Sequence, residues 1–268
     1  MNPDKTAVAE FWNKASCGED LYLSGQQKEN YETQARVRYE LEPYILEFAD
    51  FKNSGAKRVL EIGVGLGADH QEFAEAGAEL FGCDLTERAI QHTSKRLKLF
   101  GLHSMLRQVD AEALPYEDES FDLVYSWGVL HHSPDTPKAV DEAYRVLKPG
   151  GQARIMIYHR HSFVGYMLWL RFALLRCRPF TSLDTIYSRH LESPGTKAYS
   201  IPAARRLFGR FREVSIQTVL THGDLLSSLA GQRHKGVILG VARKVWPRWL
   251  IRTFFPGRGL FMLIRAAK

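Results

Sequence analysis

A run of apolar residues that ends in closely spaced glycines constrains the fold of this chain more than any other feature. The run covers residues 59–62, and residues 63–67 carry glycines in the pattern G-x-G-x-G. A helix-like stretch comes next, and a second apolar run over 80–83 then ends at Asp84. Strand, glycine turn, helix, strand and carboxylate, in this order, form the first half of a nucleotide-binding α/β unit.

The glycine spacing distinguishes between two kinds of nucleotide site. A dinucleotide fingerprint reads G-x-G-x-x-G, and the helix after it faces a pyrophosphate. Here the spacing is G-x-G-x-G, no basic residue lies near the loop, and Glu61 and Asp69 flank it. An acidic rim suits a ligand with an ammonium and a sulfonium, whereas it repels a pyrophosphate. The pattern favours S-adenosylmethionine, with Asp84 placed to accept hydrogen bonds from two ribose hydroxyls.

Three further segments make the chain resemble the class I S-adenosylmethionine-dependent methyltransferases of type 11, the broad group that includes ubiquinone and menaquinone methylases. Residues 108–115 (QVDAEALP) resemble the loop after the third strand, whose acid reaches the adenine amino group. Residues 120–132 (SFDLVYSWGVLHH) resemble the fourth strand and its active-site end, and residues 145–151 (RVLKPGG) resemble the turn into the fifth strand. The resemblance is specific over 58–158.

The resemblance implies an α/β fold with a Rossmann-like seven-stranded sheet and helices on both of its faces. It also implies S-adenosylmethionine as the cofactor and S-adenosylhomocysteine as the product. The residues that it assigns to cofactor binding are Glu61, Gly63, Gly65, Gly67, Asp84, Leu85, Asp110, Ala111, Ser126 and Trp127. In this topology the last strand inserts antiparallel beside the sixth.

Hydrophobic patterns predict the individual elements. The expected strands are Arg58–Ile62, Glu79–Cys83, Met105–Val109, Phe121–Ser126, Gln152–Tyr158, Glu213–Val219 and Gly259–Arg265. The expected helices are Tyr31–Ala49, Ala68–Ala76, Glu87–Phe100, Pro137–Leu147 and Ile201–Phe211. Thr136 is the expected N-cap of the helix over 137–147, and the sequence KPGG over 148–151 is expected to end that helix.

Three segments remain outside the expected sheet. Residues 1–57 predict an N-terminal helical cap, and 58–268 the methyltransferase core. Residues 159–200 and 221–258 are insertions after strands five and six. Because ligands of open α/β sheets bind beyond the carboxyl ends of the strands, we expect these insertions to act as lids over the acceptor.

Composition indicates a globular chain with an extended core, since 45% of the 268 residues are hydrophobic. Cys17, Cys83 and Cys177 lie far apart in no metal-binding or redox spacing, and an odd, low count suits a reducing compartment. The N-terminus shows no signal-peptide pattern, and the apolar stretch over 163–175 contains Arg171 and is too short to span a bilayer. We therefore expect a cytoplasmic protein without a metal.

Charge divides the chain into two unequal parts. Residues 1–159 contain 17 Lys and Arg against 26 Asp and Glu, a net charge of −9, whereas residues 160–268 contain 19 against 4, a net charge of +15. This asymmetry favours an anionic partner for the second part, such as a phosphate, a carboxylate, a lipid head group or nucleic acid. A solvated basic surface is the alternative. The sequence leaves the oligomeric state open.

Two histidines follow the fourth expected strand, beside the position expected for the transferred methyl group. Methyl transfer is an in-line displacement, so the protein mainly aligns donor and acceptor and excludes water. His131, with His132 second, is the candidate for a general base that takes a proton from a hydroxyl acceptor. The alternative is that this pair packs against the cofactor or holds the loop over 133–135.

Further polar residues near the ends of strands five and six are candidates for binding the acceptor. They are Tyr158, His159, His190, Lys197, Tyr199 and His222. The basic residues among them suit an anionic acceptor, and the alternative is that they line walls or form ordinary surface loops. Residues 232–235 (QRHK) are weaker candidates of the same kind.

Residues 243–256 combine basic residues with large aromatic ones. We expect a lid helix whose aromatic side chains pack on the sheet. Contact with an anionic membrane surface, at the inner face of the membrane, is the second hypothesis because Trp and Arg side chains suit the head-group region. Stacking on single-stranded nucleic acid is a distant third.

The sequence therefore predicts a methyltransferase that acts on a small, partly apolar acceptor, with an anionic group on that acceptor as an option. Oxygen is favoured over nitrogen, carbon and sulfur as the acceptor atom. The alternative is a module that binds S-adenosylmethionine and docks on membranes or a partner without robust methyl transfer. A nucleic-acid methylase comes third, because residues 126–129 (SWGV) lack an Asn-Pro-Pro-Tyr motif.

Overall fold

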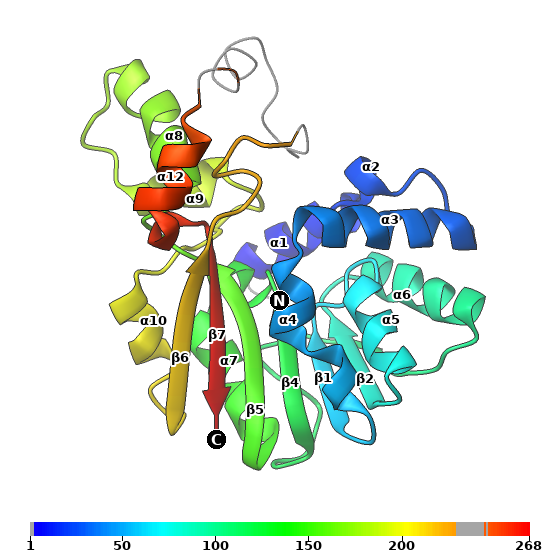
Figure 1. The fold of residues 1–268 in the computed structure, drawn as a ribbon. Coiled ribbons are helices and arrows are strands. Elements are labelled where there is room, and N and C mark those ends of the chain that lie inside the picture. The colour runs from blue at the N-terminus through cyan, green and yellow to red at the C-terminus, as the bar shows by residue number, and fades with distance from the viewer. Residues whose placement is uncertain (1–2, 229–243, 245) are drawn as a thin grey trace.

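A seven-stranded sheet runs through the molecule (Figure 1). The computed structural model describes residues 3–228, 244 and 246–268. The strands are β1 (Arg58–Ile62), β2 (Glu79–Asp84), β3 (Met105–Gln108), β4 (Phe121–Trp127), β5 (Leu147–Tyr158), β6 (Glu213–Val219) and β7 (Phe261–Ala267). Their order in the sheet is β3-β2-β1-β4-β5-β7-β6. β7 lies antiparallel to both β5 and β6, and the other paired strands are parallel, which confirms the expected topology.

Helices connect the strands. They are α1 (Pro3–Lys14), α2 (Glu19–Tyr22), α3 (Lys28–Leu41), α4 (Tyr44–Ala49), α5 (Ala68–Glu75), α6 (Glu87–Phe100), α7 (Thr136–Val146), α8 (Phe163–Phe172), α9 (Leu183–His190), α10 (Ile201–Leu207) and α12 (Arg248–Phe254). Short 3-10 turns are η1 (Phe51–Ser54), η2 (Leu130–His132), η3 (Leu174–Arg176) and η4 (Pro256–Arg258). Residues 232–235, named above as candidates, lie outside the described residues.

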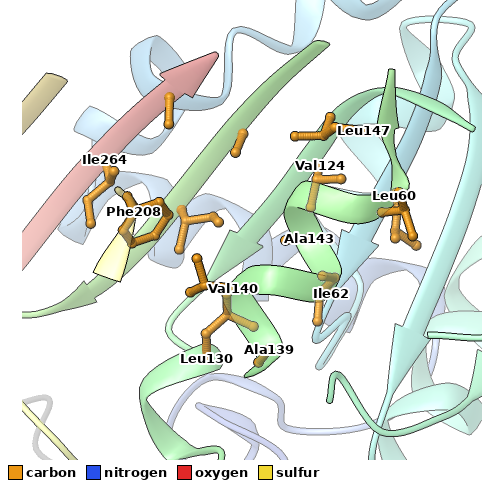
Figure 2. Close-up of a cluster of buried hydrophobic side chains, with 14 of the residues drawn as sticks. Leu60, Ile62, Val124, Leu130, Ala139, Val140, Ala143, Leu147, Phe208 and Ile264 are labelled. Atoms are coloured by element: carbon orange, nitrogen blue, oxygen red, sulfur yellow. The ribbon is translucent and has the colours of Figure 1, made fainter. Parts of the chain in front are cut away.

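Apolar side chains cover both faces of the sheet, because neighbouring residues of a strand point to opposite sides. Leu60 and Ile62 of β1 face one cluster, in which α7 supplies Val140 and Ala143 (Figure 2). Val59, the residue before Leu60, belongs to a second cluster built with α4, η1 and α5. The two clusters confirm the prediction of helices on both faces.

Three local expectations were wrong at element ends. The helix expected over 31–49 is divided into α3 and α4, because Pro43 disfavours helical geometry at Glu42, whose φ and ψ are −129° and 57°. Asp135, not Thr136, caps α7 by accepting a hydrogen bond from the backbone of Lys138 at 3.1 Å. The sequence KPGG over 148–151 does not separate α7 from the next strand, since β5 already begins at Leu147.

Two connecting segments stand above the sheet. Residues 159–200, the first connecting segment, contain α8, η3 and α9; residues 221–258, the second connecting segment, contain α12 and η4 among the described residues. Figure 1 shows both beyond the carboxyl end of β5, with α8, α9 and α12 together. None of the helices in the described part of the chain has the length and apolar character needed to cross a membrane.

Candidate active site

A cavity of about 880 Å³ lies at the carboxyl ends of the central strands. Its walls come from the N-terminal helices, the glycine loop, the ends of β2, β4 and β5, and both connecting segments. The predicted cofactor residues that line it are Glu61, Gly63, Gly65, Gly67, Asp84, Leu85, Asp110, Ala111 and Trp127. The fold thus brings together nine of the ten residues that were assigned to cofactor binding.

The glycines of the loop serve different purposes. Gly63 has φ +88°, and a Cβ atom added there would lie only 2.1 Å from Cγ2 of Val129, so a side chain would collide with the turn after β4. Gly65 has φ +52°, and a Cβ atom there would meet no atom within 4 Å. Gly63 therefore allows close packing, whereas Gly65 leaves space for a ligand to approach the backbone.

Asp84 lies at the end of β2 and is held in place by its neighbours. One carboxylate oxygen accepts hydrogen bonds from the backbone N–H and the hydroxyl of Thr86, at 2.9 and 2.8 Å. The other accepts from the backbone N–H of Gly65, at 3.3 Å. Burial raises the pKa of Asp84, and these donors oppose that shift. Fixed donors behind a carboxylate leave its remaining lone pairs directed at the cavity, as two ribose hydroxyls require.

Glu61 is buried at the end of β1 and contacts a buried histidine, His70. Its Oε2 lies 2.8 Å from Nδ1 of His70, whose Nε2 lies 2.8 Å from the hydroxyl of Ser104. That hydroxyl donates to the carbonyl of Leu80, so it accepts from His70, and Nδ1 must then accept from Glu61. Burial raises the pKa of Glu61 and lowers that of His70 to about 3, in accord with a protonated, neutral Glu61.

Asp69, which the sequence placed in an acidic rim, does not act as a free anion. Arg38 of α3 donates to both of its carboxylate oxygens, at 3.1 and 2.7 Å, and the hydroxyls of Tyr39 and Tyr125 donate at 3.1 and 2.8 Å. These donors, with the Arg38 charge foremost, lower the pKa of Asp69 against the effect of burial. The rim therefore contains the ion pair between Asp69 and the Arg38 guanidinium, because the N-terminal helix α3 packs over it.

A second arginine supports the glycine loop from behind. Arg96 of α6 is fully buried and donates to the carbonyl of Leu66 in the loop, at 3.2 Å. It also donates to the side chains of Gln71 and Gln34 and to the carbonyl of Tyr31. Since these acceptors are neutral, burial dominates and lowers the pKa of Arg96 to about 10. The loop conformation is thereby tied to α3, α5 and α6.

The first helix contacts the loop after β3. Lys5 of α1 forms ion pairs with Asp110, at 2.5 Å, and with Glu112. Asp110 is the residue expected to reach the adenine amino group, and its side chain lies in the cavity wall together with that of Lys5. The N-terminal helices consequently form part of the cofactor end of the cavity.

Ser126 is the one predicted cofactor residue that lies outside the cavity wall. Its hydroxyl is fully buried and donates to the carbonyl of Ile62 at 2.9 Å, joining β4 to β1. Trp127, the next residue, does line the cavity. The difference follows from strand geometry, since consecutive side chains point to opposite faces.

The two histidines after β4 also differ in position. His131 is fully buried outside the cavity wall, and its ring lies 4.0 Å from that of Tyr158. Neither of its ring nitrogens has a hydrogen-bond partner among the described residues. Burial lowers its pKa. His132 lines the cavity. The structure thus places His132, and not His131, where a side chain could reach an acceptor in the cavity, as a general base must.

His132 belongs to a polar cluster in the cavity wall. Its Nδ1 lies 2.8 Å from the hydroxyl of Ser193 and 3.1 Å from that of Thr196. Its Nε2 lies 3.3 Å from a carboxylate oxygen of Glu192, without hydrogen-bond geometry, and the hydroxyl of Tyr158 donates to the same oxygen at 2.7 Å. We call His132, Tyr158 and Glu192 the polar cluster.

The other predicted acceptor residues are divided by the fold. Tyr158 and His222 line the cavity, whereas His159, His190, Lys197 and Tyr199 do not. His159 bonds the carbonyl of Gly259, the ring of His190 stacks on Phe172 at 4.0 Å, Lys197 donates to the carbonyl of Ser133, and Tyr199 pairs with His159 in a β-bridge. The structure gives these four residues packing or bridging contacts instead of a place at the cavity.

Several residues of the cavity wall were not predicted from the sequence. Arg38, Glu42 and Trp12 come from the N-terminal helices, and Glu192 comes from the first connecting segment. Glu42 lies 3.6 Å from Arg38, and burial raises its pKa to about 7. A charged Arg-x-x-x-Glu pair at helical spacing was visible at 38–42, but helical spacing does not show which surface the helix covers. In the described part of the chain, no cluster of three or more His, Cys, Asp or Glu has the arrangement of a metal site.

The sheet order, the glycine loop and the acid after β2 define a class I methyltransferase fold that binds S-adenosylmethionine and S-adenosylhomocysteine. Residues 60–155 match the family described as "Methyltransferase domain" (Methyltransf_11). Residues 60–155 therefore form a methyltransferase domain of this family, on the class I S-adenosylmethionine-dependent fold.

Known proteins resemble parts of the chain. An uncharacterized protein of Mycobacterium tuberculosis is 34% identical over 128 residues, which cover 47% of this chain and 45% of that protein. The ubiquinone biosynthesis O-methyltransferase of Pseudomonas fluorescens is 30% identical over 132 residues, 48% of this chain and 57% of that enzyme. The chain therefore spans about half the length of the curated relatives that it matches.

A solved structure shows the same fold at lower identity. It is phosphoethanolamine N-methyltransferase 2 of Haemonchus contortus, in complex with phosphomonomethylethanolamine and S-adenosylhomocysteine. The TM-score is 0.57 at 17% identity, over 84% of this chain and 52% of that one. Since one of these similar enzymes is an O-methyltransferase and another an N-methyltransferase, the shared domain leaves the acceptor open.

Proposed function

We propose that this chain transfers a methyl group from S-adenosylmethionine to a hydroxyl group of a small, largely apolar molecule. The observation that carries the proposal is the polar cluster in an otherwise apolar part of the cavity wall. The same cavity wall contains the apolar residues Trp12, Leu41, Met156, Val164, Leu168, Leu191, Leu260 and Phe261. These walls suit an apolar acceptor, and the cluster suits one polar group on it.

The cofactor end supplies groups of the kinds that S-adenosylmethionine requires. Asp84 would hold the ribose hydroxyls, and the loop with Asp110 and Ala111 would hold the adenine. Gly65 leaves its backbone approachable, and Arg38 places a positive charge in the same wall, where it suits a carboxylate. When bound, S-adenosylmethionine supplies an electrophilic methyl group on a positively charged sulfur.

His132 is the group that we assign as proton acceptor. Thr196 donates its hydroxyl hydrogen to the carbonyl of Ser193 at 2.7 Å, so toward Nδ1 of His132 it acts as an acceptor. The Ser193 hydroxyl, 2.8 Å from Nδ1, can accept in the same way. In the tautomer with its proton on Nδ1, the lone pair of His132 is on Nε2. An acceptor hydroxyl can then pass its proton to Nε2, where the Glu192 carboxylate at 3.3 Å stabilises the resulting positive charge.

The remaining walls align the acceptor and exclude water. Tyr158 keeps Glu192 in place through its 2.7 Å hydrogen bond, and its ring stacks on that of Phe261 with an interplanar angle of 10°. We propose that both connecting segments act as lids, since residues of each line the cavity beyond the strand ends. An enclosed apolar site strengthens the charge interactions within it.

The test measures transfer of a labelled methyl group to a phenol, an amine, a carboxylic acid and a thiol of comparable size. We expect the phenol to be methylated fastest. His132→Asn keeps a polar group near the position of Nδ1 and removes Nε2, so kcat should fall about 10²–10⁴-fold while S-adenosylmethionine binding, measured by calorimetry, is unchanged.

His190→Asn is the matched control, because His190 is a histidine of the first connecting segment outside the cavity wall. Its kcat should stay within about threefold of the unmodified protein. Equal losses in the two variants would contradict the role of His132. Labelling of RNA or protein, with none of the small acceptors labelled, would contradict the proposed substrate class.

A further inference from the structure

Helix α8 is apolar around its whole circumference, and yet most of its residues are only partly buried. Its sequence is FVGYMLWLRF, and Arg171 is its one charged residue. Only Gly165 and Leu168 of the ten residues are buried. A helix that is apolar all round is normally buried in a core or in a membrane. In the described structure one side of α8 packs against α9, and Tyr166, Leu170 and Arg171 are exposed.

The accessible apolar surface continues beyond the end of α8. Leu170 and Leu174 are each almost half exposed, Leu175 is 71% exposed, and Phe180 is 99% exposed. We call residues 170–180 the lid tip. Single apolar residues on a surface are ordinary, but four large ones within eleven positions form an unusual concentration.

Positive charge accompanies this apolar surface. The lid tip contains Arg171, Arg176 and Arg178 and no acidic residue. In the wider segments 160–192 and 244–258, nine Lys and Arg stand against two Asp and Glu. Apolar side chains mixed with arginines complement a surface that is apolar inside and anionic outside, as an anionic bilayer is.

Helix α12 adds a second group of exposed aromatic residues beside α8. Phe255 lies 5.9 Å from Phe163 of α8, and Arg258 donates to the hydroxyl of Tyr166 at 3.5 Å. Figure 1 shows the two helices adjacent. The expectation that the aromatics of this region pack on the sheet was wrong for Trp249 and Phe254, which are 72% and 63% exposed.

The cavity reaches the lid tip. Leu170, Arg171 and Leu175 line the cavity and are also accessible from outside. The cavity wall therefore extends to the segment in which the exposed apolar residues are concentrated. A nucleic acid fits this surface less well, because leucine side chains do not stack on bases as aromatic rings do.

We propose that the lid tip docks on an anionic lipid bilayer and that a lipid-soluble acceptor enters the cavity from that bilayer. The second part rests on the proposed function, whereas the docking itself does not. In the docked state the leucines and Phe180 enter the boundary between head groups and acyl chains, and the three arginines contact the lipid phosphates.

The experiment measures sedimentation of the intact protein with vesicles, in the absence of methyl donor and acceptor. One set of vesicles contains phosphatidylcholine alone, and the other also contains phosphatidylglycerol. We expect binding to the mixed vesicles, weaker binding to phosphatidylcholine alone, and a decrease as salt is added, since salt screens the arginines.

Two double variants separate the apolar and the charged contributions. Leu174→Ser with Phe180→Ser, and Arg176→Gln with Arg178→Gln, should each weaken binding on the order of tenfold. The matched controls are Met105→Ser, which removes an exposed apolar side chain from the edge strand β3, and Arg212→Gln, which removes an exposed arginine near the start of β6. Neither control should change vesicle binding, and all four variants should bind S-adenosylmethionine as the unmodified protein does.

Absence of binding to mixed vesicles would overturn the docking proposal, as would equal binding by the lid-tip variants and the controls. Binding to single-stranded RNA but not to vesicles would assign the surface to nucleic acid and would overturn it too. Because the assay contains neither substrate, these results are independent of methyl transfer. Vesicle binding together with preferred turnover of water-soluble acceptors would retain the docking and reject entry from the bilayer.

Discussion

The cofactor end of the cavity and the lid tip differ in how their side chains are satisfied. Polar groups have partners within the chain at the cofactor end, whereas apolar groups are exposed to solvent at the lid tip. At the cofactor end, Asp69 accepts hydrogen bonds from three side chains, and Asp84 accepts from Thr86 and Gly65. At the lid tip, Leu175 and Phe180 are exposed and the neighbouring charges are all positive. The carboxylates of the cofactor end find their hydrogen-bond donors within the chain, whereas the lid tip presents side chains that suit an external surface.

This difference shows how one fold can keep the same methyl donor while the methyl acceptor varies. Groups held rigidly before binding lose little entropy when the ligand arrives, so the cofactor end is preorganised for one molecule. The polar cluster is held similarly, but the walls beyond it come from the first and second connecting segments. These walls can change without disturbing the glycine loop, because they contact the sheet only near the strand ends.

The largest effect on stability is expected at the ion pair that joins α3 to the cofactor end. Arg38→Met would leave the Asp69 carboxylate buried without its cation, at a cost of about 3 kcal/mol in the free energy of unfolding, the lower end for a buried pair since Arg38 is partly exposed. Urea denaturation measures this loss.

Arg36→Met on the same helix is the control, because Arg36 is exposed, and its effect should stay within about 0.5 kcal/mol. Equal destabilisation by the two variants would show that the cofactor end does not depend on this charge pair, and would weaken the contrast with the lid tip.

A smaller effect is expected on cofactor affinity. Asp84→Ala removes a charged hydrogen-bond acceptor from the end of β2, so S-adenosylmethionine should bind about 10–100-fold more weakly in calorimetry. The affinity of Asp84→Asn, which retains one acceptor oxygen, should lie between those of Asp84→Ala and the unmodified protein. Asp184→Ala in the first connecting segment is the matched control, and unchanged affinity in Asp84→Ala would refute the assignment of the ribose site.

The smallest effect is a dependence on pH at Glu42. Burial raises its pKa from 4.5 to about 7, so between these values the folded chain retains a proton that the unfolded chain has lost. The Glu42 contribution to stability therefore falls as pH rises through this window, by roughly 1–2 kcal/mol once its remaining exposure is considered.

Glu42→Gln abolishes that titration, so its stability relative to the unmodified protein should increase between pH 5 and pH 8 in urea denaturation. Glu40→Gln, on the exposed side of the same helix, should show the same relative stability at both pH values. A relative stability of Glu42→Gln that does not vary with pH would mean that Glu42 is ionised throughout.

Much of the cofactor end could be predicted because its signals are local. The glycine pattern, the acid after β2 and the alternation of apolar residues each arise within a few positions. Six of the seven strands lie within about two residues of their expected ends, and β5 begins five residues earlier than expected. Contacts between distant segments could not be predicted. Lys5 and Asp110 are 105 positions apart, and no pattern within either segment indicates that they meet.

The sequence by itself determined the order of strands and helices, the methyltransferase fold and the position of the cofactor loop, because periodicity and turn chemistry are encoded locally. Only the tertiary structure decided that His132 and not His131 faces the cavity, since adjacent residues differ in direction and not in type. It also decided that Asp69 is neutralised by Arg38. The packing of α8 against α9, which composition cannot show, left the lid tip exposed beside the cavity.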